Sequence, residues 1–371
     1  MAGYQTLDFK NVLIFRIGHL GDTVMALPAL WAIRNAFPNA CLTLLTNIDL
    51  RNPHYVSPRN VLPEKGIIDE WIAYPAKAVA FFRLSLELRR RHFDAVIYLM
   101  PRIRSSKQID RDMRFFRFSG ISKVIGAEYL RRNSLEQEIP KPTPVVQSES
   151  DFLLRLLSSE GIHGDGAKTE LLLDDAEISS AKNWFRATVN TAHKGRKLIA
   201  IAPGSKWKSK IWSEMRFADV VRRLIAKNNC YPVIFGDDED REKGERLLAG
   251  WKTGANAAGV LKIRESAALL RDCSLYLGND TGTMHLAAAV GTPCVAIFAA
   301  IDWRGRWAPF GSRNQIFRKT VECEGCHTPD CFNQNKCLDL VTANEVYEAC
   351  ERVICQKEKP NAAGQGFDLT V

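Results

Sequence analysis

The sequence predicts an α/β protein in which two parallel-sheet domains follow one another along the chain. The chain has 371 residues, more than the roughly 100–200 of an ordinary single domain. Short apolar, β-branched runs alternate with helical patterns in both halves, which is typical of doubly wound parallel sheets. The alternation breaks where three prolines occur between Pro140 and Pro144. We therefore expect an N-terminal domain at residues 1–180 and a C-terminal domain at residues 181–371.

The expected elements follow this alternation. Strands are predicted at residues 12–17, 42–46, 93–100 and 124–125, and then at 198–202, 231–235, 274–277 and 294–298. A helix is expected from the turn after the first strand to a point near Pro38, another near residues 151–157, and a polar stretch from there to Lys197. Later helices are predicted at residues 217–227, 241–248, 265–271, 282–290 and 343–355, the last closing the fold.

Composition and charge narrow the class of protein. A hydrophobic fraction of 46% and a charged fraction of 25% are typical of globular chains. The net charge of +9 is concentrated between Arg83 and Arg132. This stretch contains 13 Lys and Arg residues but only 5 Asp and Glu residues. This stretch favours an anionic partner such as a phosphorylated lipid, an acidic sugar, a membrane surface or nucleic acid, and a solvated basic face fits it equally well.

The chain contains no stretch of ~18 consecutive apolar residues, so no membrane span is expected. Residues 1–10 also lack the apolar run of a secretory signal. We therefore expect a cytoplasmic protein whose ten cysteines are mostly reduced thiols.

A glycine-containing turn from Gly18 to Asp22 follows the first predicted strand. Two glycines permit close backbone approach at the carboxyl end of a parallel strand, where ligands of open α/β sheets bind. Asp22 falls near the start of the next helix, so it can cap that helix or accept a proton from a substrate hydroxyl. The residues alone favour the cap, since aspartate is a preferred capping residue.

Two segments of the second half are typical of phosphate sites. Residues 203–212 (PGSKWKSKIW) place lysines and tryptophans directly after a strand. Asp280, Thr281 and Gly282 fall at a helix N-terminus, where backbone amides and the helix dipole favour phosphate. His285, one turn further on, fits a phosphate ligand and a structural histidine equally well.

Two further patterns leave alternatives open. The acidic segment at residues 235–240 suits ribose hydroxyls, but acids in the first turn of a helix are the simpler interpretation. Near the C-terminus four cysteines lie within fifteen residues: Cys323, Cys326, Cys331 and Cys337. Tetrahedral zinc fits four such thiols, yet their spacing is looser than that of paired CxxC motifs, so free or redox-active thiols remain the alternative.

Over nearly its whole length the chain resembles glycosyltransferase family 9, the heptosyltransferase family. Three segments carry the resemblance: residues 16–30 (RIGHLGDTVMALPAL), 203–212, and 278–293 (GNDTGTMHLAAAVGTP). The resemblance implies a GT-B fold, two facing Rossmann-like domains with a cleft between them, with the acceptor bound N-terminally and the nucleotide sugar C-terminally. The chain departs from many relatives at Gly18-His19 and in its dense run of lysines.

The resemblance also implies roles for individual residues. Asp22 takes the role of general base in an inverting transfer that requires no cofactor. The donor site implied by position comprises Ser205, Lys210, Glu239, Asp280, Thr281, Gly282 and His285. The expected acceptor ligands are Gly18, Gly21, Arg102 and Arg104.

The implied reaction transfers heptose from ADP-heptose to the anionic lipopolysaccharide core at the inner face of the inner membrane. Another nucleotide sugar used in cell-surface polysaccharide synthesis is the alternative donor. A non-catalytic nucleotide-sugar-binding protein and a nucleotide-sugar epimerase are the rival functions, and nucleic acid is not an expected partner. A base at Asp22 argues against the non-catalytic binding protein. The basic stretch argues against the epimerase.

Overall fold

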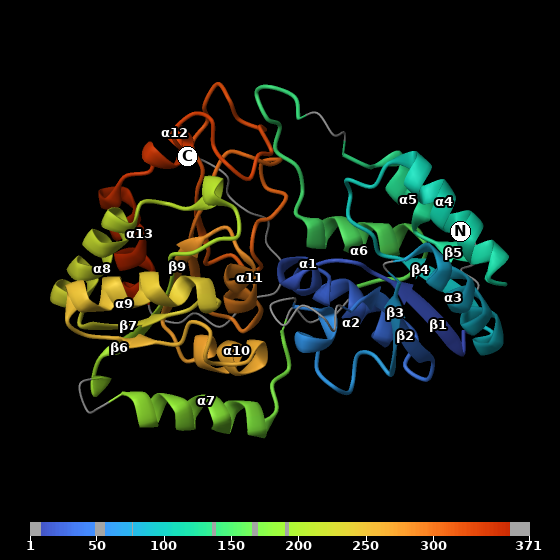
Figure 1. Ribbon diagram of the computed structural model, residues 1–371, viewed down its shortest axis with the longest axis horizontal. Coiled ribbons are helices and arrows are strands. Elements are labelled where there is room, and N and C mark those ends of the chain that lie inside the picture. The colour runs from blue at the N-terminus through green and yellow to red at the C-terminus, as the bar shows by residue number, and fades with distance from the viewer. Residues whose placement is uncertain are drawn as a thin grey trace. The chain divides into compact units, whose positions relative to one another are not determined.

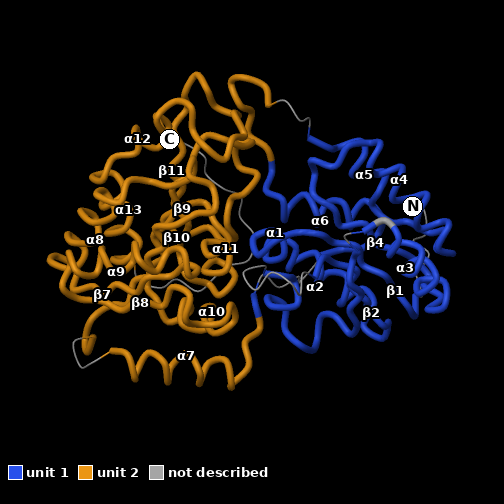
Figure 2. The backbone as a smooth tube through the Cα atoms, in the orientation of Figure 1, with its two compact units in different colours: residues 1–138, 147–171 blue, residues 139–146, 172–371 orange. Residues whose placement is uncertain are grey.

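The computed structural model describes residues 9–48, 56–75, 77–135, 139–164, 170–189 and 193–356 (Figure 1). The chain divides into two compact units (Figure 2). Unit 1 comprises residues 1–138 and 147–171, and unit 2 comprises residues 139–146 and 172–371. Each unit has its own parallel sheet.

The sheet of unit 1 has the strand order β3-β2-β1-β4-β5. Its strands are β1 (Asn11–Phe15), β2 (Cys41–Asn47), β3 (Glu70–Tyr74), β4 (Ala95–Tyr98) and β5 (Val124–Ile125). Every pairing is parallel, and β1 lies at the centre with its last four residues fully or almost fully buried. The strand β3 was not among the predicted elements, and only Ile72 of its five residues is buried.

The helices of unit 1 are α1 (Leu20–Met25), α2 (Leu27–Ala36), α3 (Ala78–Arg91), α4 (Ser106–Phe118), α5 (Ala127–Arg132) and α6 (Glu149–Ser159). The single helix expected up to Pro38 is wrong, because the chain forms two helices that meet at Ala26. Pro28 lies in the first turn of α2, where its missing N–H costs no hydrogen bond. Pro28 therefore marks the start of a second helix within the segment that was expected to form a single helix.

The sheet of unit 2 has the strand order β11-β10-β9-β6-β7-β8. Its strands are β6 (Lys197–Ala202), β7 (Cys230–Ile234), β8 (Ala255–Asn256), β9 (Leu275–Asn279), β10 (Cys294–Ile297) and β11 (Gln315–Phe317). All pairings are parallel. The short edge strands β8 and β11 were missed by the sequence analysis, since two or three residues give no readable periodicity.

The helices of unit 2 are α7 (Asp175–Thr188), α8 (Glu214–Asn228), α9 (Arg241–Trp251), α10 (Ile263–Arg271), α11 (Gly282–Ala289), α12 (Lys336–Asp339) and α13 (Ala343–Cys355). The polar stretch expected before Lys197 is wrong, because it contains α7. This helix starts at the capping box of Asp174 and Glu177 and buries only Ala181 and Phe185, so its apolar stripe is narrow. Figure 1 shows α7 alongside α10, and Arg264 of α10 pairs with Glu177 of α7.

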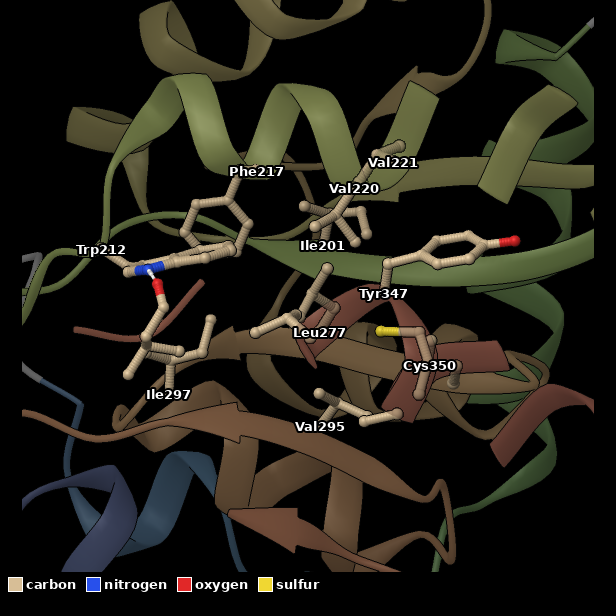
Figure 3. Close-up of a cluster of buried hydrophobic side chains, with 14 of the residues drawn as sticks. Ile201, Trp212, Phe217, Val220, Val221, Leu277, Val295, Ile297, Tyr347 and Cys350 are labelled. Carbon is tan, nitrogen blue, oxygen red and sulfur yellow. Dashed lines mark hydrogen bonds between the residues drawn. The ribbon is translucent and has the colours of Figure 1, made fainter. Parts of the chain in front are cut away.

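The core of unit 2 joins the sheet to α8 and α13. Figure 3 shows Ile201, Leu277 and Val295 of three adjacent strands in one cluster with Trp212 and Phe217, whose ring centroids are 4.9 Å apart. Trp212 is fully buried, and its indole Nε1 donates to the Val341 carbonyl at 3.0 Å. The segment after β6 is thereby fixed to the segment before α13.

Residues 139–146 belong to unit 2 although the chain on both sides belongs to unit 1. Val146 N donates to the Arg304 carbonyl at 2.8 Å, and Thr143 N donates to Glu324 Oε1 at 2.8 Å. Arg318 holds the other oxygen of Glu324 at 3.1 Å, and both side chains are buried. This buried ion pair ties the crossing segment to unit 2.

Candidate functional site

The turn after β1 is fixed by a buried arginine. Arg16 is 1% exposed. Its guanidinium donates to the Leu99 carbonyl after β4 and to the Asp22 carbonyl in α1, both at 2.8 Å. One side chain therefore links the carboxyl ends of two neighbouring strands to the first helix.

Gly18 permits a close approach between this turn and α1. A Cβ atom at Gly18 would lie 2.3 Å from Asp22 Cβ, so no other residue fits without moving the helix. Gly18 N donates to Asn47 Oδ1 at 3.0 Å, and Asn47 Nδ2 donates back to the Gly18 carbonyl at 3.2 Å. Asn47 is the last residue of β2, so these two bonds join the ends of β1 and β2. The sequence did not indicate this role of Asn47.

Asp22 is the third residue of α1 and has a capping contact. Its Oδ2 accepts from His19 N at 2.9 Å, while Oδ1 lies 3.8 Å from an Arg16 guanidinium nitrogen. The side chain is 22% exposed, so the carboxylate still reaches solvent. The geometry is therefore compatible with both roles considered for Asp22 from the sequence, the helix cap and the general base. Gly21 precedes Asp22 in the same helix.

The two arginines predicted to bind the acceptor are engaged within unit 1. Arg102 is 7% exposed, stacks on the Phe152 ring at 4.5 Å and donates to the Gln147 carbonyl at 3.3 Å. Arg104 pairs with buried Asp112 and donates to the Tyr98 hydroxyl. Burial and the Asp112 carboxylate raise the pKa of the Tyr98 hydroxyl. The partners described for both arginines are other residues than Asp22, and the role of the arginines at an acceptor stays a prediction.

Other cations of the arginine-rich stretch line a pocket of about 660 Å³ on α4 and α5. The pocket's charged lining residues are Lys107, Arg114, Arg117 and Arg131, together with Asp110 and Glu128. Arg131 pairs with both acids, at 2.6 Å and 3.4 Å. The remaining cations leave an excess of positive charge, which suits an anionic group. In the sequence, the excess of positive charge between Arg83 and Arg132 had already favoured an anionic partner for residues of this stretch.

In unit 2, Asn279 organises the loops at the carboxyl ends of β6 and β9. It is completely buried, and its Nδ2 donates to the carbonyls of Pro203 and Gly204 at 3.0 and 3.2 Å. Its Oδ1 accepts from Trp212 N at 3.1 Å. Asn279 belongs to the 278–293 segment that carries the family resemblance, but the sequence did not indicate a role for it. Asn279 fixes the loop at 203–212 beside the start of α11.

Lys210 and Asp280 meet at this point. Lys210 Nζ lies 2.7 Å from Asp280 Oδ2, and Asp280 is 7% exposed. The ammonium also lies 5.7 Å from the centre of the Trp207 ring. Thr281 is the N-cap residue of α11 and Gly282 its first residue, so their backbone amides belong to the dipole-positive end of the helix. Four predicted donor residues thus lie together: Lys210, Asp280, Thr281 and Gly282.

The other predicted donor residues differ in their surroundings. The Ser205 hydroxyl accepts from Trp207 N at 3.4 Å within the lysine loop. His285 is 3% exposed and contacts the Trp307 ring at a centroid distance of 6.2 Å, so it lies inside the unit. Glu239 is exposed, in the turn after β7.

Asp240, beside Glu239, is the acid that approaches the β6 loop. A Cβ atom at Gly204 would lie 1.7 Å from Asp240 Oδ1, so the carboxylate lies directly against the Gly204 backbone. Burial, with a smaller contribution from the Asp237 carboxylate, raises the pKa of Asp240 to about 6. Glu239 was expected from the family resemblance, since the sequence alone does not tell which of the four consecutive acids at residues 237–240 points inward. Its role as a ribose ligand stays a prediction.

Cys323, Cys326 and Cys331 lie in a loop that packs on the lysine segment, and Cys337 lies in α12. Backbone N–H groups donate to Cys331 Sγ from Asn335 at 3.2 Å and to Cys337 Sγ from Ala300 at 3.4 Å. His327 contacts the Trp207 ring, and the Ser209 hydroxyl donates to the Thr328 carbonyl at 2.6 Å. Within the described residues no group of three His, Cys, Asp or Glu side chains is arranged to hold a metal ion.

Comparison with known proteins identifies the family. The model of glycosyltransferase family 9 (heptosyltransferase) matches residues 81–337, more than half of the chain. The chain belongs to glycosyltransferase family 9. This confirms the resemblance seen in the sequence.

Individual relatives of this family 9 chain are distant. Lipooligosaccharide heptosyltransferase 2 of Haemophilus influenzae is 25% identical and aligns over 78% of this chain and 83% of its own. Lipopolysaccharide heptosyltransferase 3 of Escherichia coli is 23% identical over 90% and 96%. Lipopolysaccharide heptosyltransferase 2 of E. coli K12 is 28% identical over 134 residues, and the match spans 38% of its length.

Solved structures show the same fold. A family 9 glycosyl transferase from Veillonella parvula has a TM-score of 0.74 at 20% identity, covering 95% of this chain and 99% of its own. E. coli ADP-heptose lipopolysaccharide heptosyltransferase II has a TM-score of 0.65 at 19% identity, covering 93% and 98%. The predicted GT-B class, with two parallel-sheet α/β domains, is thereby confirmed. Among the described helices, none is long and apolar enough to cross a bilayer.

Proposed function

We propose that this family 9 chain is an inverting glycosyltransferase that moves a sugar from a nucleotide-diphosphate donor to an anionic glycolipid acceptor of lipopolysaccharide synthesis. The observation that carries the proposal is the Lys210–Asp280 pair at the start of α11, held beside the Gly204 loop by buried Asn279. Family membership supplies the reaction type.

The donor diphosphate would bind to Lys210 and to the backbone amides at Thr281 and Gly282. A helix N-terminus and an ammonium group both favour phosphate oxygens. Asp280 positions the lysine through the 2.7 Å contact. The absence of a side chain at Gly204 lets the Asp240 carboxylate lie against the backbone of that loop.

The chemical step needs one proton acceptor and one stabilised leaving group. Asp22 would take the proton from the acceptor hydroxyl while that oxygen forms a bond to the anomeric carbon of the sugar. The bond from this carbon to the diphosphate oxygen breaks at the same time, which inverts the configuration. The negative charge that develops on the diphosphate would be stabilised by Lys210 and the helix dipole, and a metal ion is not needed for this.

The proposed sugar is heptose, carried by ADP. One of the structurally similar E. coli heptosyltransferases was solved with ADP-2-deoxy-2-fluoro heptose. The acceptor would be the acidic inner part of lipopolysaccharide, presented at the cytoplasmic face of the inner membrane. The cations of the arginine-rich stretch suit its phosphates and carboxylates.

The test is transfer from a panel of nucleotide sugars, including ADP-heptose, UDP-glucose and GDP-mannose, to a deacylated lipopolysaccharide-core acceptor. Transfer from ADP-heptose alone is the expected result. Transfer from another donor would support the proposed type of reaction but replace heptose as the proposed sugar. Tight binding of a nucleotide sugar without turnover on any acceptor would favour the non-catalytic binding protein instead.

A structural zinc ion at the four C-terminal cysteines stays a separate prediction. One structurally similar glycosyltransferase, from enterotoxigenic E. coli, contains iron. Metal analysis of the purified chain for zinc and iron, compared with the Cys331→Ser variant, tests this prediction. About one metal equivalent that is lost in the variant would support the zinc site, and a metal-free wild-type chain would favour free or redox-active thiols.

A further inference from the structure

Helix α3 presents a row of apolar side chains to solvent. Val79 is 82% exposed, Phe82 62% and Leu86 38%. Helix positions separated by three and four residues lie on one side, so these three form a single stripe. Leu84 and Leu88 on the opposite side are buried in unit 1, so the stripe is not part of the core. Grouped apolar side chains of this kind mark an interaction surface.

Helix α4 shares this outer surface. The two helices pack side by side, since the Ser119 hydroxyl donates to that of Ser85 at 3.0 Å and the rings of Phe81 and Phe115 are 5.7 Å apart. Figure 1 shows α3 and α4 as neighbours in unit 1. Each helix also buries the side that faces the sheet. Their exposed sides must therefore point away from the sheet in the same direction.

Phe118 extends the apolar stripe onto α4. It is the last residue of the helix and is 59% exposed. The Arg89 guanidinium of α3 lies 5.1 Å from the centre of its ring and donates to its backbone carbonyl at 2.9 Å. An arginine that stacks along an apolar surface with its charge in water has the geometry of an interfacial side chain.

Basic residues surround the stripe. On a helical projection Arg89 lies on one side of it, and Arg83 and Arg90 lie on the other. The exposed cations of α4 are Lys107, Arg111, Arg114 and Arg117. The acids are largely neutralised, since Glu87 pairs with Arg91 at 3.1 Å and Asp110 with Arg131 at 2.6 Å. Apolar residues ringed by cations are typical of helices that lie on anionic membranes.

We propose that this α3–α4 surface, formed by Val79, Phe82, Leu86 and Phe118 with the surrounding cations, docks unit 1 on an anionic phospholipid bilayer. The apolar side chains enter the interface, and the arginines bind headgroup phosphates. The inference deepens the proposed function and rests on it in one respect, because a lipid-linked acceptor is presented at such a bilayer.

The charge distribution favours a bilayer over a second copy of the chain. Two copies that met through this surface would bring their arginines face to face, and like charges across an interface are costly. The centre of a protein interface is also depleted in charged residues, whereas here cations lie on both sides of a stripe one residue wide. An anionic lipid surface complements both the charge and the apolar residues.

The experiment is sedimentation of the full chain with vesicles of phosphatidylcholine alone or with about one third phosphatidylglycerol. We expect binding to the anionic vesicles that weakens with salt. Replacing Val79, Phe82 and Leu86 together by serine should weaken it at least about tenfold. Arg83→Gln with Arg90→Gln should weaken it about 25-fold, since each cation contributes about fivefold. Met215→Ser, on α8 and 81% exposed, is the matched control and should bind as the wild type does.

Several outcomes would overturn the inference. These are equal binding to both kinds of vesicle, undiminished binding of the serine variant, or a serine variant that changes from dimer to monomer in sedimentation velocity without a change in lipid binding. Transfer to the deacylated, soluble acceptor should be unchanged in the serine variant. If vesicles bind but no donor supports transfer, the proposed function fails and the docking surface stands. If transfer occurs but vesicles do not bind, the reverse holds.

Discussion

Asn279 shows how one buried amide can position a loop. Its three hydrogen bonds connect the end of β9 to both ends of the segment from Pro203 to Trp212. A buried amide with every partner in place is worth more than its pairwise bonds suggest, because each partner would otherwise be unsatisfied in a low-dielectric interior. Lys210 owes its position beside Asp280 to this arrangement.

Lys210→Ala should weaken nucleoside-diphosphate binding about 10- to 100-fold. The variant loses a charge-assisted contact to phosphate and leaves the Asp280 carboxylate without its cation. Isothermal titration with ADP measures the effect. Lys208→Ala is the control, because the Lys208 side chain is 86% exposed in the same loop. Equal affinities of the two variants would remove Lys210 from the donor site.

Asp240 should make stability depend on pH. Its pKa is raised to about 6 in the folded chain, against about 3.9 unfolded. Folding therefore favours the protonated acid, and its stabilisation is complete below pH 4 and lost as the pH rises to about 6. Asp240→Asn should remove this loss, so the variant gains ~2–3 kcal/mol relative to the wild type between pH 4 and pH 7. Urea unfolding at several pH values measures it, and parallel curves would contradict it.

At the residue scale, the sequence predicted the positions that depend on a local motif. Asp280, Thr281 and Gly282 were readable because a strand end, small residues and a helix start follow one another within a few positions. Asp240 and Asn47 were not, because their roles depend on which loop lies opposite them in space. Arg102 was chosen for its charge, but burial against Phe152 cannot be read from composition.

At the scale of elements, α1 is a helix of six residues whose position is set by its contacts. Arg16 binds its backbone, Gly18 permits the approach of the turn, and Asp22 caps its first turn. So short a helix is not stable by itself. The orientation of the Asp22 carboxylate therefore depends on the turn that precedes it.

Gly18→Ala should displace α1 and lower transfer by roughly 100-fold, because small errors in the position of a base are costly. Stability should fall by about 1–3 kcal/mol, since the new Cβ would lie 2.3 Å from Asp22 Cβ. Transfer assays and urea unfolding report the two effects. Gly250→Ala in α9 is the control, because a Cβ there meets nothing within 4 Å. Full activity of the Gly18 variant would show that α1 does not position the base.

Elements with a strong pattern were predictable, and those held by tertiary contacts were not. The strands β6, β7 and β9 and the helix α13 are buried along a continuous apolar run or stripe, so the sequence placed them within a few residues. The strand β3 and the helix α7 bury only one or two side chains each. Their existence depends on the neighbouring strand and on α10, which sequence periodicity does not report.

At the scale of the molecule, the proposed chemistry is divided between two units. Unit 1 contributes Asp22 and the α3–α4 surface, and unit 2 contributes Lys210 and the start of α11. The alternation of strands and helices predicted two sheets, and family membership agrees with them. The passage of residues 139–146 through unit 2 was not predictable, because it rests on the buried contact between Thr143 and Glu324.

Single-turnover transfer by the Asp22→Asn variant tests whether Asp22 deprotonates the acceptor in a sugar transfer. Asparagine can still accept the hydrogen bond from His19 N, so the helix cap is kept while the base is lost. We predict a rate about 10²–10⁴ times lower, with donor affinity unchanged and with Asp219→Asn on α8 as active as the wild type. A variant that transfers at the wild-type rate would contradict the account and leave Asp22 with a capping role alone.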